Sequence, residues 1–255
     1  MDPIQKFLME CEEEIQLQSE DAEFVALSKQ WIEKANSLKY SYHFNWMDRP
    51  IIQYPTDIIA LHEIIYKTKP TYIIETGIAH GGSVTFNASQ MALLDIVDPL
   101  PNDRKRHVFA IDIDIRDHNR KKLEEHPLAN YFTLYEGSST DPALIEKVED
   151  DIEGLHQNID GGMVILDSNH THDHVFKELN CFEKFVSPGK YLVVFDTIVE
   201  FLENSSWPGR DWSKGNNPYT AVIEFLSKNT EFEIDKSIDN QIMFGVGPSG
   251  YLKKK

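Results

Sequence analysis

Several features that would place the protein in a special class are scarce or missing from its sequence. Its 255 residues include two cysteines, Cys11 and Cys181, which are too far apart for a metal or redox motif and suit a reducing compartment. The chain has no run of 18 or more apolar residues, so we expect no membrane-spanning helix. Its first residues do not combine a basic start with an apolar stretch, so we expect no secretory signal.

Positive charge is also scarce. Lys and Arg number 25 against 42 Asp and Glu, which gives a formal net charge of −17. This balance repels phosphate backbones and anionic lipids, so we expect neither a nucleic acid nor a membrane surface as the main partner. With 41% apolar and 26% charged residues, the chain can bury a sizeable core. We expect a globular cytoplasmic protein.

The N-terminal part of the chain differs from the rest. Residues 1–40 are acidic, and their apolar side chains recur near the helical period. Residues 41–55 are aromatic and broken by two prolines, which is typical of an ordered connector. We predict a helical N-terminal extension and connector over residues 1–55, which caps the protein or joins two copies of it in a homo-oligomer. We predict one domain over residues 56–255.

From residue 56 onward, short apolar runs alternate with stretches of helical periodicity. Near-continuous apolar strands between helices indicate a parallel sheet with both faces covered. The expected parallel strands are 72–74, 108–111, 131–135, 163–166 and 191–195. The expected helices are 56–68, 83–94, 116–126, 141–150, 172–186 and 218–228. A closing antiparallel pair, 232–234 and 242–246, completes the seven strands of an α/β fold, and we expect the lysines of 253–255 to form a solvated tail.

Acidic or small polar residues stand where the predicted parallel strands end: Glu75, Asp112, Ser138, Asp167 and Asp196. In an open α/β sheet, ligands bind beyond these ends, near the switch in strand order. The glycine-rich turn after the first strand has neither the G-x-G-x-x-G spacing nor a Walker lysine. An acid before this turn and Asp112 after the second strand suit S-adenosylmethionine, which carries a sulfonium, an amino-acid head and a ribose but no phosphate. The alternative is a tight turn that binds no ligand.

Asp167 and Asp196 follow neighbouring parallel strands, so we expect their carboxylates in one crevice. Converging carboxylates without an obvious basic partner favour a hard divalent cation, Mg²⁺ by preference. Zinc is an alternative because His170 and His174 lie four residues apart, although the glutamate of the H-E-x-x-H motif is absent. His170 follows Asp167 closely, and because histidine titrates near neutral pH, it is a candidate general base for a hydroxyl proton.

The segment 198–217 is long for a connection between a strand and a helix. It is polar and broken by glycine and proline, yet it carries Trp207 and Trp212. Long loops at the carboxyl ends of a sheet are often lids, and the two aromatic side chains would then cover a sugar ring or an adenine. The equally plausible alternative is that the tryptophans pin the loop to the protein.

Six segments, in their order along the chain, resemble the cephalosporin hydroxylase family over roughly residues 40–245. They read WMDRPIIQYPTD, IIETGIAHGGS, AIDIDIR, ILDSNHTHDHV, VSPGKYLVVFDT and NPYTAV. The fold of that family is similar to the class I S-adenosylmethionine-dependent methyltransferases, and its members include sugar and antibiotic O-methyltransferases. The resemblance therefore implies a Rossmann-like methyltransferase fold, S-adenosylmethionine as cofactor and a small-molecule or carbohydrate acceptor.

The resemblance also implies where the cofactor would bind. Its methionine end would be lined by Glu75, Gly77, Ala79, Gly81 and Ser83. Asp112 would hold the ribose, Ser138 and Ser139 would flank the adenine, and Asp167 would also lie against the cofactor.

Roles in metal binding and catalysis follow from the same resemblance. Asp167 and Asp196 would hold Mg²⁺, with Asp167 and His170 as the catalytic residues and His170 as the general base. Where relatives often have Glu-Asp, this chain has Phe195-Asp196, which removes a third carboxylate. Thr197 or His170 would then complete the metal site, or the metal would be absent.

We predict a Mg²⁺-assisted O-methyltransferase that acts on a hydroxyl group, and three alternatives remain. A hydroxylase, as the family name suggests, would use a non-haem iron on His170, His174 and Asp167. A nicotinamide oxidoreductase is disfavoured by the spacing of the glycine-rich turn. A non-catalytic partner subunit that retains only the fold would bind no cofactor.

Overall fold

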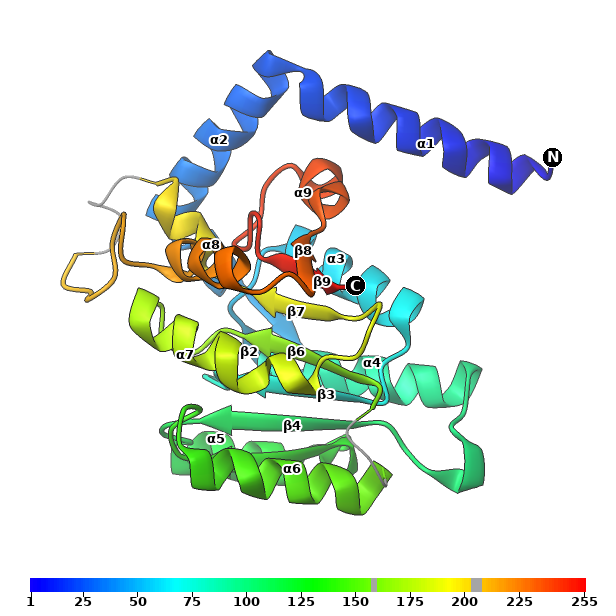
Figure 1. The fold of residues 1–255 in the computed structure, drawn as a ribbon, viewed down its shortest axis with the longest axis vertical. Coiled ribbons are helices and arrows are strands. Elements are labelled where there is room, and N and C mark those ends of the chain that lie inside the picture. Colours follow the sequence, from blue (N-terminus) through cyan, green and yellow to red (C-terminus); the bar gives the residue numbers. More distant parts are fainter. Residues whose placement is uncertain (157–159, 203–207) are drawn as a thin grey trace.

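The computed structural model describes residues 1–156, 160–202 and 208–255, and its centre is a seven-stranded sheet (Figure 1). The strands lie in the order β5-β4-β3-β6-β7-β9-β8. The five strands from β3 to β7 run parallel, and β9 is antiparallel to both of its neighbours. In chain order the strands are β3 (Tyr72–Thr76), β4 (His107–Asp112), β5 (Phe132–Glu136), β6 (Gly162–Leu166), β7 (Tyr191–Val194), β8 (Phe232–Ile234) and β9 (Tyr251–Lys254). The predicted α/β fold with a mostly parallel seven-stranded sheet is confirmed.

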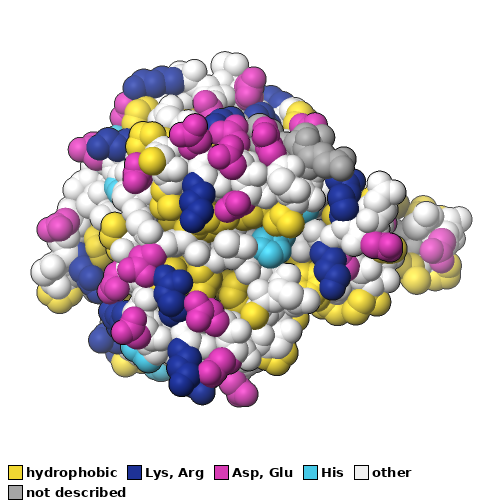
Figure 2. Space-filling view, turned by 90° about the horizontal axis from the view of Figure 1, so that it is seen from below, with side chains coloured by type: hydrophobic (Ala, Val, Ile, Leu, Met, Phe, Trp, Pro, Cys, Tyr) yellow, Lys and Arg dark blue, Asp and Glu magenta, His cyan; other side chains and the backbone are white. Residues whose placement is uncertain are grey.

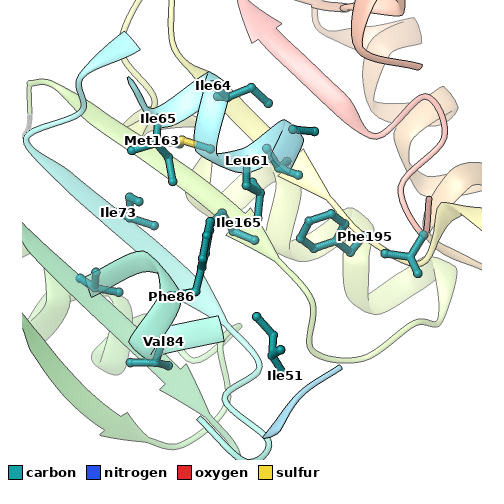
Figure 3. Packing of buried hydrophobic residues seen from close by; sticks show 14 of the residues in the cluster. Ile51, Leu61, Ile64, Ile65, Ile73, Val84, Phe86, Met163, Ile165 and Phe195 are labelled. Atoms are coloured by element: carbon teal, nitrogen blue, oxygen red, sulfur yellow. The ribbon is translucent and has the colours of Figure 1, made fainter. Parts of the chain in front are cut away.

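Helices cover both faces of this sheet. One face carries α3 (Pro55–Thr68), α4 (Gly82–Val97) and α5 (Asp117–Glu124), and the other carries α6 (Pro142–His156), α7 (His172–Phe182) and α8 (Pro218–Lys228). Successive residues of a strand point to opposite faces, so Ile73 packs in the first layer, whereas Tyr72 and Ile74 pack in the second. Figure 3 shows the first layer, where Ile73, Ile165 and Phe195 from the sheet region meet Leu61 and Ile65 from α3. The two apolar layers fix the sheet and its carboxyl edge.

Of the two N-terminal helices, the second contributes Ile32 and Ala35 to the first layer, whereas the first lies outside both layers. They are α1 (Pro3–Glu20) and α2 (Ala22–Ser37), with Asp21 capping α2 through hydrogen bonds from the backbone N–H groups of Glu23 and Phe24. Figure 1 shows α1 extending away from the sheet, and it has no buried residue. The predicted helical character of this region agrees with the structure. Its role in self-association and the domain boundary at residue 55 stay predictions.

The connector contains structure that the sequence did not indicate. A short 3-10 helix, η1 (Tyr40–His43), precedes an antiparallel hairpin of β1 (Phe44–Trp46) and β2 (Arg49–Ile51). Met47 and Asp48 form its turn with positive φ angles, a conformation that non-glycine residues seldom adopt. The hairpin packs on α4, since a Cβ atom on Gly82 would lie 2.3 Å from the carbonyl oxygen of Pro50. The connector is therefore fixed against the sheet.

The predicted strand at 242–246 is wrong. Helix α9 (Lys236–Ile242) occupies its beginning, because the side chain of Asp235 accepts a hydrogen bond from the Ser237 N–H and starts a helix there. The last strand is instead β9, which pairs with β7 and β8. The predicted solvated tail is also wrong, because Lys254 belongs to β9 and its Nζ lies 3.5 Å from a carboxylate oxygen of Glu231.

In the described residues the elements also include four more 3-10 turns: η2 (Pro101–Asp103), η3 (Ala129–Tyr131), η4 (Glu183–Phe185) and η5 (Thr197–Glu200). On the face that Figure 2 shows, Lys and Arg side chains lie scattered among Asp and Glu side chains. Across the described part of the chain, none of the helices has the length and apolar character needed to cross a bilayer.

Candidate functional site

A cavity of about 520 Å³ opens at the carboxyl ends of the parallel strands. It lies at the switch in strand order, where the chain passes from β5 at one edge of the sheet to β6 on the other side of β3. Loops after β3, β4, β5, β6 and β7 contribute to its wall, and so do the connector and the loop before α8. Its volume is in the range of small-ligand sites. Among the predicted site residues, the lining includes Gly77, Ala79, Ser83, Asp112, Ser138, Ser139, Asp167, His170 and Asp196.

The turn between β3 and α4 is hydrogen-bonded to the end of β4. Gly77 has φ +93°, and a Cβ atom there would lie 2.0 Å from the carbonyl oxygen of Asp167, so only glycine fits. The backbone N–H groups of Ile78 and Ala79 donate to Oδ2 of Asp112 at 2.7 and 3.1 Å. Asp112 therefore holds the turn in place and at the same time lines the cavity.

Glu75 and Gly81 lie close to this turn but do not line the cavity. Glu75 is buried under α4, where Oε2 accepts a hydrogen bond of 2.7 Å from Asn87 Nδ2, and no described residue is within hydrogen-bond distance and geometry of Oε1. Burial, which disfavours the charged carboxylate, raises the pKa of Glu75 to about 7. Gly81 precedes α4 with φ +86°. Their predicted contact with the cofactor stays a prediction, and the structure gives Glu75 a place behind the cavity wall.

Two serines form the wall beyond β5. Ser138 Oγ lies 3.1 Å from Thr140 Oγ1, and Ser139 Oγ lies 3.2 Å from His174 Nε2. Both serines line the cavity, as the predicted adenine site requires. His174 also faces Glu178, with Nε2 at 3.5 Å from Oε1. These contacts tie the loop after β5 to helix α7.

Asp167, His170 and Asp196 form the one group of side chains that could hold a metal in the described part of the chain. One potential ligand atom from each lies within 4.8 Å of the others, and His170 Nε2 is 3.1 Å from Asp196 Oδ2. Asp196 has φ 55° and ψ 20°, a left-handed conformation that is uncommon for aspartate and turns the chain directly after β7. Desolvation, followed by the nearby carboxylate of Asp196, raises the pKa of Asp167 well above its ordinary value. The carboxylates of Asp167 and Asp196 disfavour each other's charge, and a cation between them would relieve this repulsion.

Thr197 and Phe195 flank Asp196, but their side chains do not line the cavity. Thr197 is fully buried and outside the cavity lining, and its hydroxyl donates to the carbonyl oxygen of Pro248 at 2.6 Å. This placement does not support its predicted role as a metal ligand. Phe195 extends into the first apolar layer, as Figure 3 shows, and is 2% exposed. The position that lacks a carboxylate is therefore a core position in this chain.

The connector contributes lining residues that the sequence patterns did not indicate, and Gln53 and Tyr54 are two of them. Gln53 Nε2 donates a hydrogen bond of 3.1 Å to Asp167 Oδ2. Tyr54 is 2% exposed, its hydroxyl has no hydrogen-bond partner among the described residues, and desolvation and the Asp57 carboxylate raise its pKa to about 12. A signal was present, since the polar Gln53 follows two isoleucines and stands two residues before the proline that starts α3.

The loop before α8 reaches over the candidate metal-ligating group of Asp167, His170 and Asp196. The ring of Trp212 meets the ring of His170 edge-on, with 4.7 Å between centroids, and the guanidinium of Arg210 lies 5.0 Å above the Trp212 ring. Both residues line the cavity. Of the two predicted lid aromatics, Trp212 thus lies at the site, while Trp207 lies outside the described residues. Closure of this loop stays a prediction.

The structure does not assemble the iron set proposed for a hydroxylase. His174 is engaged by Ser139 and Glu178, and the group that does converge in the described chain contains one histidine and two carboxylates. Oxygen-rich ligand sets of this kind suit Mg²⁺ better than zinc or iron. The residues present therefore fit the predicted Mg²⁺.

Comparisons with known proteins address the fold and the family. A sequence model described as "Rhamnosyl O-methyltransferase/CmcI" matches residues 38–255. The rhamnosyl O-methyltransferase of Mycobacterium tuberculosis is 28% identical over 200 residues, which cover 77% of this chain and 72% of that protein. The enzyme of the same name from Mycobacterium leprae is 26% identical over 214 residues, which cover 82% of each chain.

A solved CmcI structure described as a complex with Mg and SAM is similar in fold. It superposes with a TM-score of 0.55 and 18% identity, covering 84% of this chain and 77% of that chain. This likeness, together with the strand order, confirms the predicted class I methyltransferase-like fold.

Proposed function

The chain belongs to the rhamnosyl O-methyltransferase/CmcI family and is thereby an S-adenosylmethionine-dependent O-methyltransferase, and we propose that its acceptor is a sugar hydroxyl bound in the cavity at the carboxyl edge of the sheet. The observation that carries the proposal is that four side chains from the carboxyl ends of three different strands converge on one cavity: Asp112, Asp167, His170 and Asp196. The rhamnosyl O-methyltransferases among its relatives suggest a rhamnose-like acceptor.

The half of the cavity beside α4 suits the cofactor. Asp112 offers carboxylate oxygens for ribose hydroxyls, and the loop after β5 offers Ser138 and Ser139. The N-terminal end of α4, with Ser83 facing the cavity, carries the partial positive charge that favours a carboxylate such as that of the methionine head. S-adenosylmethionine supplies an electrophilic methyl group on a positively charged sulfur.

The other half of the cavity suits the acceptor. Trp212 offers an aromatic face of the kind that packs against sugar rings, and it stands directly over His170. Asp167 and Asp196 would hold Mg²⁺, which supplies a Lewis acid that lowers the pKa of a coordinated hydroxyl. The acceptor is proposed to sit between these carboxylates and the tryptophan ring.

The proposed chemical role of His170 is to take the proton of the acceptor hydroxyl as the oxygen attacks the methyl carbon. The carboxylate of Asp196, at 3.1 Å from Nε2, orients the imidazole and stabilises the imidazolium that results. Gln53 and the backbone of Gly77 fix the position of Asp167. The remaining contribution is positional, because oriented reactants can gain about 7–11 kcal/mol over the reaction in solution.

Two measurements test the proposal. Calorimetric titration with S-adenosylhomocysteine should show binding to the wild type, at least about tenfold weaker binding to Asp112→Asn, and unchanged binding to Asp114→Asn, an exposed neighbour outside the cavity lining. Incubation with S-adenosylmethionine and methyl rhamnopyranoside should yield a singly methylated sugar by mass spectrometry. Absence of S-adenosylhomocysteine binding would refute the cofactor site, and methylation of simple phenols but not of the rhamnoside would refute the sugar acceptor.

A further inference from the structure

Gln53 occupies an unusual position where the connector meets the candidate metal-ligating group. It is 3% exposed and lines the cavity, and its amide nitrogen donates to Asp167 Oδ2 at 3.1 Å. Its amide oxygen is buried and has no hydrogen-bond partner among the described residues. A buried carbonyl oxygen without a partner is costly, and where one occurs next to a functional group it calls for an explanation.

The metal-ligating group itself is short of oxygen ligands. Among the described residues it contains two carboxylates, from Asp167 and Asp196, and one imidazole from His170. Phe195 packs in the apolar core and supplies no ligand, and the hydroxyl of Thr197 is taken by Pro248. Mg²⁺ prefers six oxygen ligands in octahedral geometry. A further protein oxygen next to the two carboxylates would improve the site.

We propose that Gln53 is an oxygen ligand of the divalent cation held by Asp167 and Asp196, an inference that rests on the proposed function. The nitrogen and oxygen of an amide exchange places when the group turns over about its last side-chain bond, which puts Oε1 at the present position of Nε2. That position is 3.1 Å from Asp167 Oδ2. Neighbouring ligands of an octahedral Mg²⁺ at 2.0–2.1 Å are about 3.0 Å apart, so the spacing fits two ligands of one ion.

The backbone around Gln53 keeps the amide in place. β2 ends two residues before it and α3 begins at Pro55, two residues after it, so the short link between them is held at both ends. Pro50 and Ile51 pack against Gly82 at the start of α4. The residue is therefore presented by fixed elements, as a metal ligand has to be.

The charge of the site follows from this assignment. Two carboxylates and a neutral amide carry less negative charge than the three carboxylates that a glutamate at position 195 would have provided. Because ligand charge sets the affinity for a hard cation, the wild type should bind the ion more weakly than Gln53→Glu. Sensitivity to the available concentration of divalent cation is the expected consequence.

Mn²⁺ binding tests the assignment without any acceptor. Mn²⁺ shares the oxygen preference of Mg²⁺, and electron paramagnetic resonance measures its dissociation constant with S-adenosylhomocysteine present. We expect Gln53→Leu to weaken Mn²⁺ binding at least about tenfold and Gln53→Glu to strengthen it. Gln90→Leu is the matched control, because Gln90 is a 5% exposed glutamine in α4 outside the cavity lining, and it should bind Mn²⁺ as the wild type does.

Water-proton relaxation separates a ligand from a residue that merely positions Asp167. If Gln53 is a ligand, Mn²⁺ bound to Gln53→Leu carries one more water molecule than Mn²⁺ bound to the wild type. An unchanged number of waters, or an unchanged dissociation constant, would overturn the inference. If Gln53→Leu does not fold, as judged by circular dichroism, Gln53→Asn replaces it, because its shorter side chain keeps the amide but withdraws it from the ion.

The failure of this inference is distinguishable from that of the proposed function. A wild type that binds S-adenosylhomocysteine and methylates the rhamnoside but binds no Mn²⁺ would overturn the ligand assignment and leave methyl transfer intact. A wild type that binds Mn²⁺ with the expected loss in Gln53→Leu, but no S-adenosylhomocysteine, would support the ligand assignment and refute the cofactor site.

Discussion

Substitution of Glu75 by glutamine should stabilise the protein at alkaline pH and much less at acidic pH. Glu75 is 1% exposed, and burial raises its pKa from an ordinary value of 4.5 to about 7. Between these two values the folded protein keeps the proton while the unfolded chain releases it. The contribution of this group to stability is therefore complete below pH 4.5 and is lost as the pH rises through 7.

The magnitude follows from the size of the pKa shift. One pKa unit corresponds to about 1.4 kcal/mol, and from pH 5.5 to pH 8 this single group costs the wild type about 2 kcal/mol of unfolding free energy. The glutamine of the variant would keep an acceptor for the hydrogen bond from Asn87 and has no charge to desolvate. The unfolding free energy of Glu75→Gln minus that of the wild type should thus rise by about 2 kcal/mol over this interval.

Urea unfolding followed by circular dichroism at both pH values gives this difference, and pH 5.5 stays above the isoelectric point of about 4.9. Other buried groups titrate nearby, since burial raises the pKa of Asp57 to about 7 and lowers that of His107 to about 4. Their effects cancel because they are common to both proteins. The control Glu146→Gln removes an exposed carboxylate of α6 that water solvates in both states, and its difference should stay flat. A flat or falling difference for Glu75→Gln would refute the argument from burial.

Three further predictions concern the site. Gly77→Ala should lower the free energy of unfolding by at least about 2 kcal/mol, because its Cβ would lie 2.0 Å from the Asp167 carbonyl oxygen. Gly154→Ala, whose Cβ would have no atom within 4 Å, should be neutral or stabilising, so equal urea midpoints for the two variants would contradict this reasoning. His170→Ala should reduce kcat for the rhamnoside by about 10²–10⁴-fold and abolish the acidic limb of the pH–rate profile, and an unchanged profile would remove the base role. Trp212→Ala should raise KM for the rhamnoside while leaving calorimetric binding of S-adenosylhomocysteine within about twofold; weakening of cofactor binding instead would place the indole over the adenine.

Most of the sheet could be predicted because its inner strands are continuous apolar runs that end in polar residues. The alternation of these runs with helical periodicity predicts parallel strands, and the carboxyl ends of parallel strands meet at one edge. This reasoning predicted that Asp112, Asp167 and Asp196 would share a cavity, as the structure shows.

The C-terminal part was less predictable because the chain there carries conflicting local signals. The run 242–246 is apolar, but Asp235 starts a helix and Val246 donates its N–H to Asp57 instead of to a neighbouring strand. The true last strand begins at Tyr251, lies between β7 and β8, and continues into lysines whose long side chains reach solvent and acidic partners. Composition alone cannot distinguish such a strand from a tail.

Sequence patterns could not predict the contacts across the cavity. Gln53 meets Asp167 although 114 residues separate them, and the connector that carries Gln53 has no regular periodicity. Thr197 follows Asp196 directly, yet the left-handed backbone of Asp196 turns the chain so that the threonine hydroxyl faces Pro248. Its position next to Asp196 in the sequence therefore does not place the Thr197 hydroxyl in the cavity. The contact between Gln53 and Asp167 could not be predicted because the two residues are far apart in the sequence.

The most direct test of the account is a crystal structure of the protein grown with S-adenosylhomocysteine and Mn²⁺, with anomalous data collected at the manganese edge. The account predicts the ribose hydroxyls beside Asp112 and an anomalous peak between the carboxylates of Asp167 and Asp196. A nucleoside bound elsewhere on the protein, or no manganese at those two carboxylates while the cofactor is in place, would contradict it.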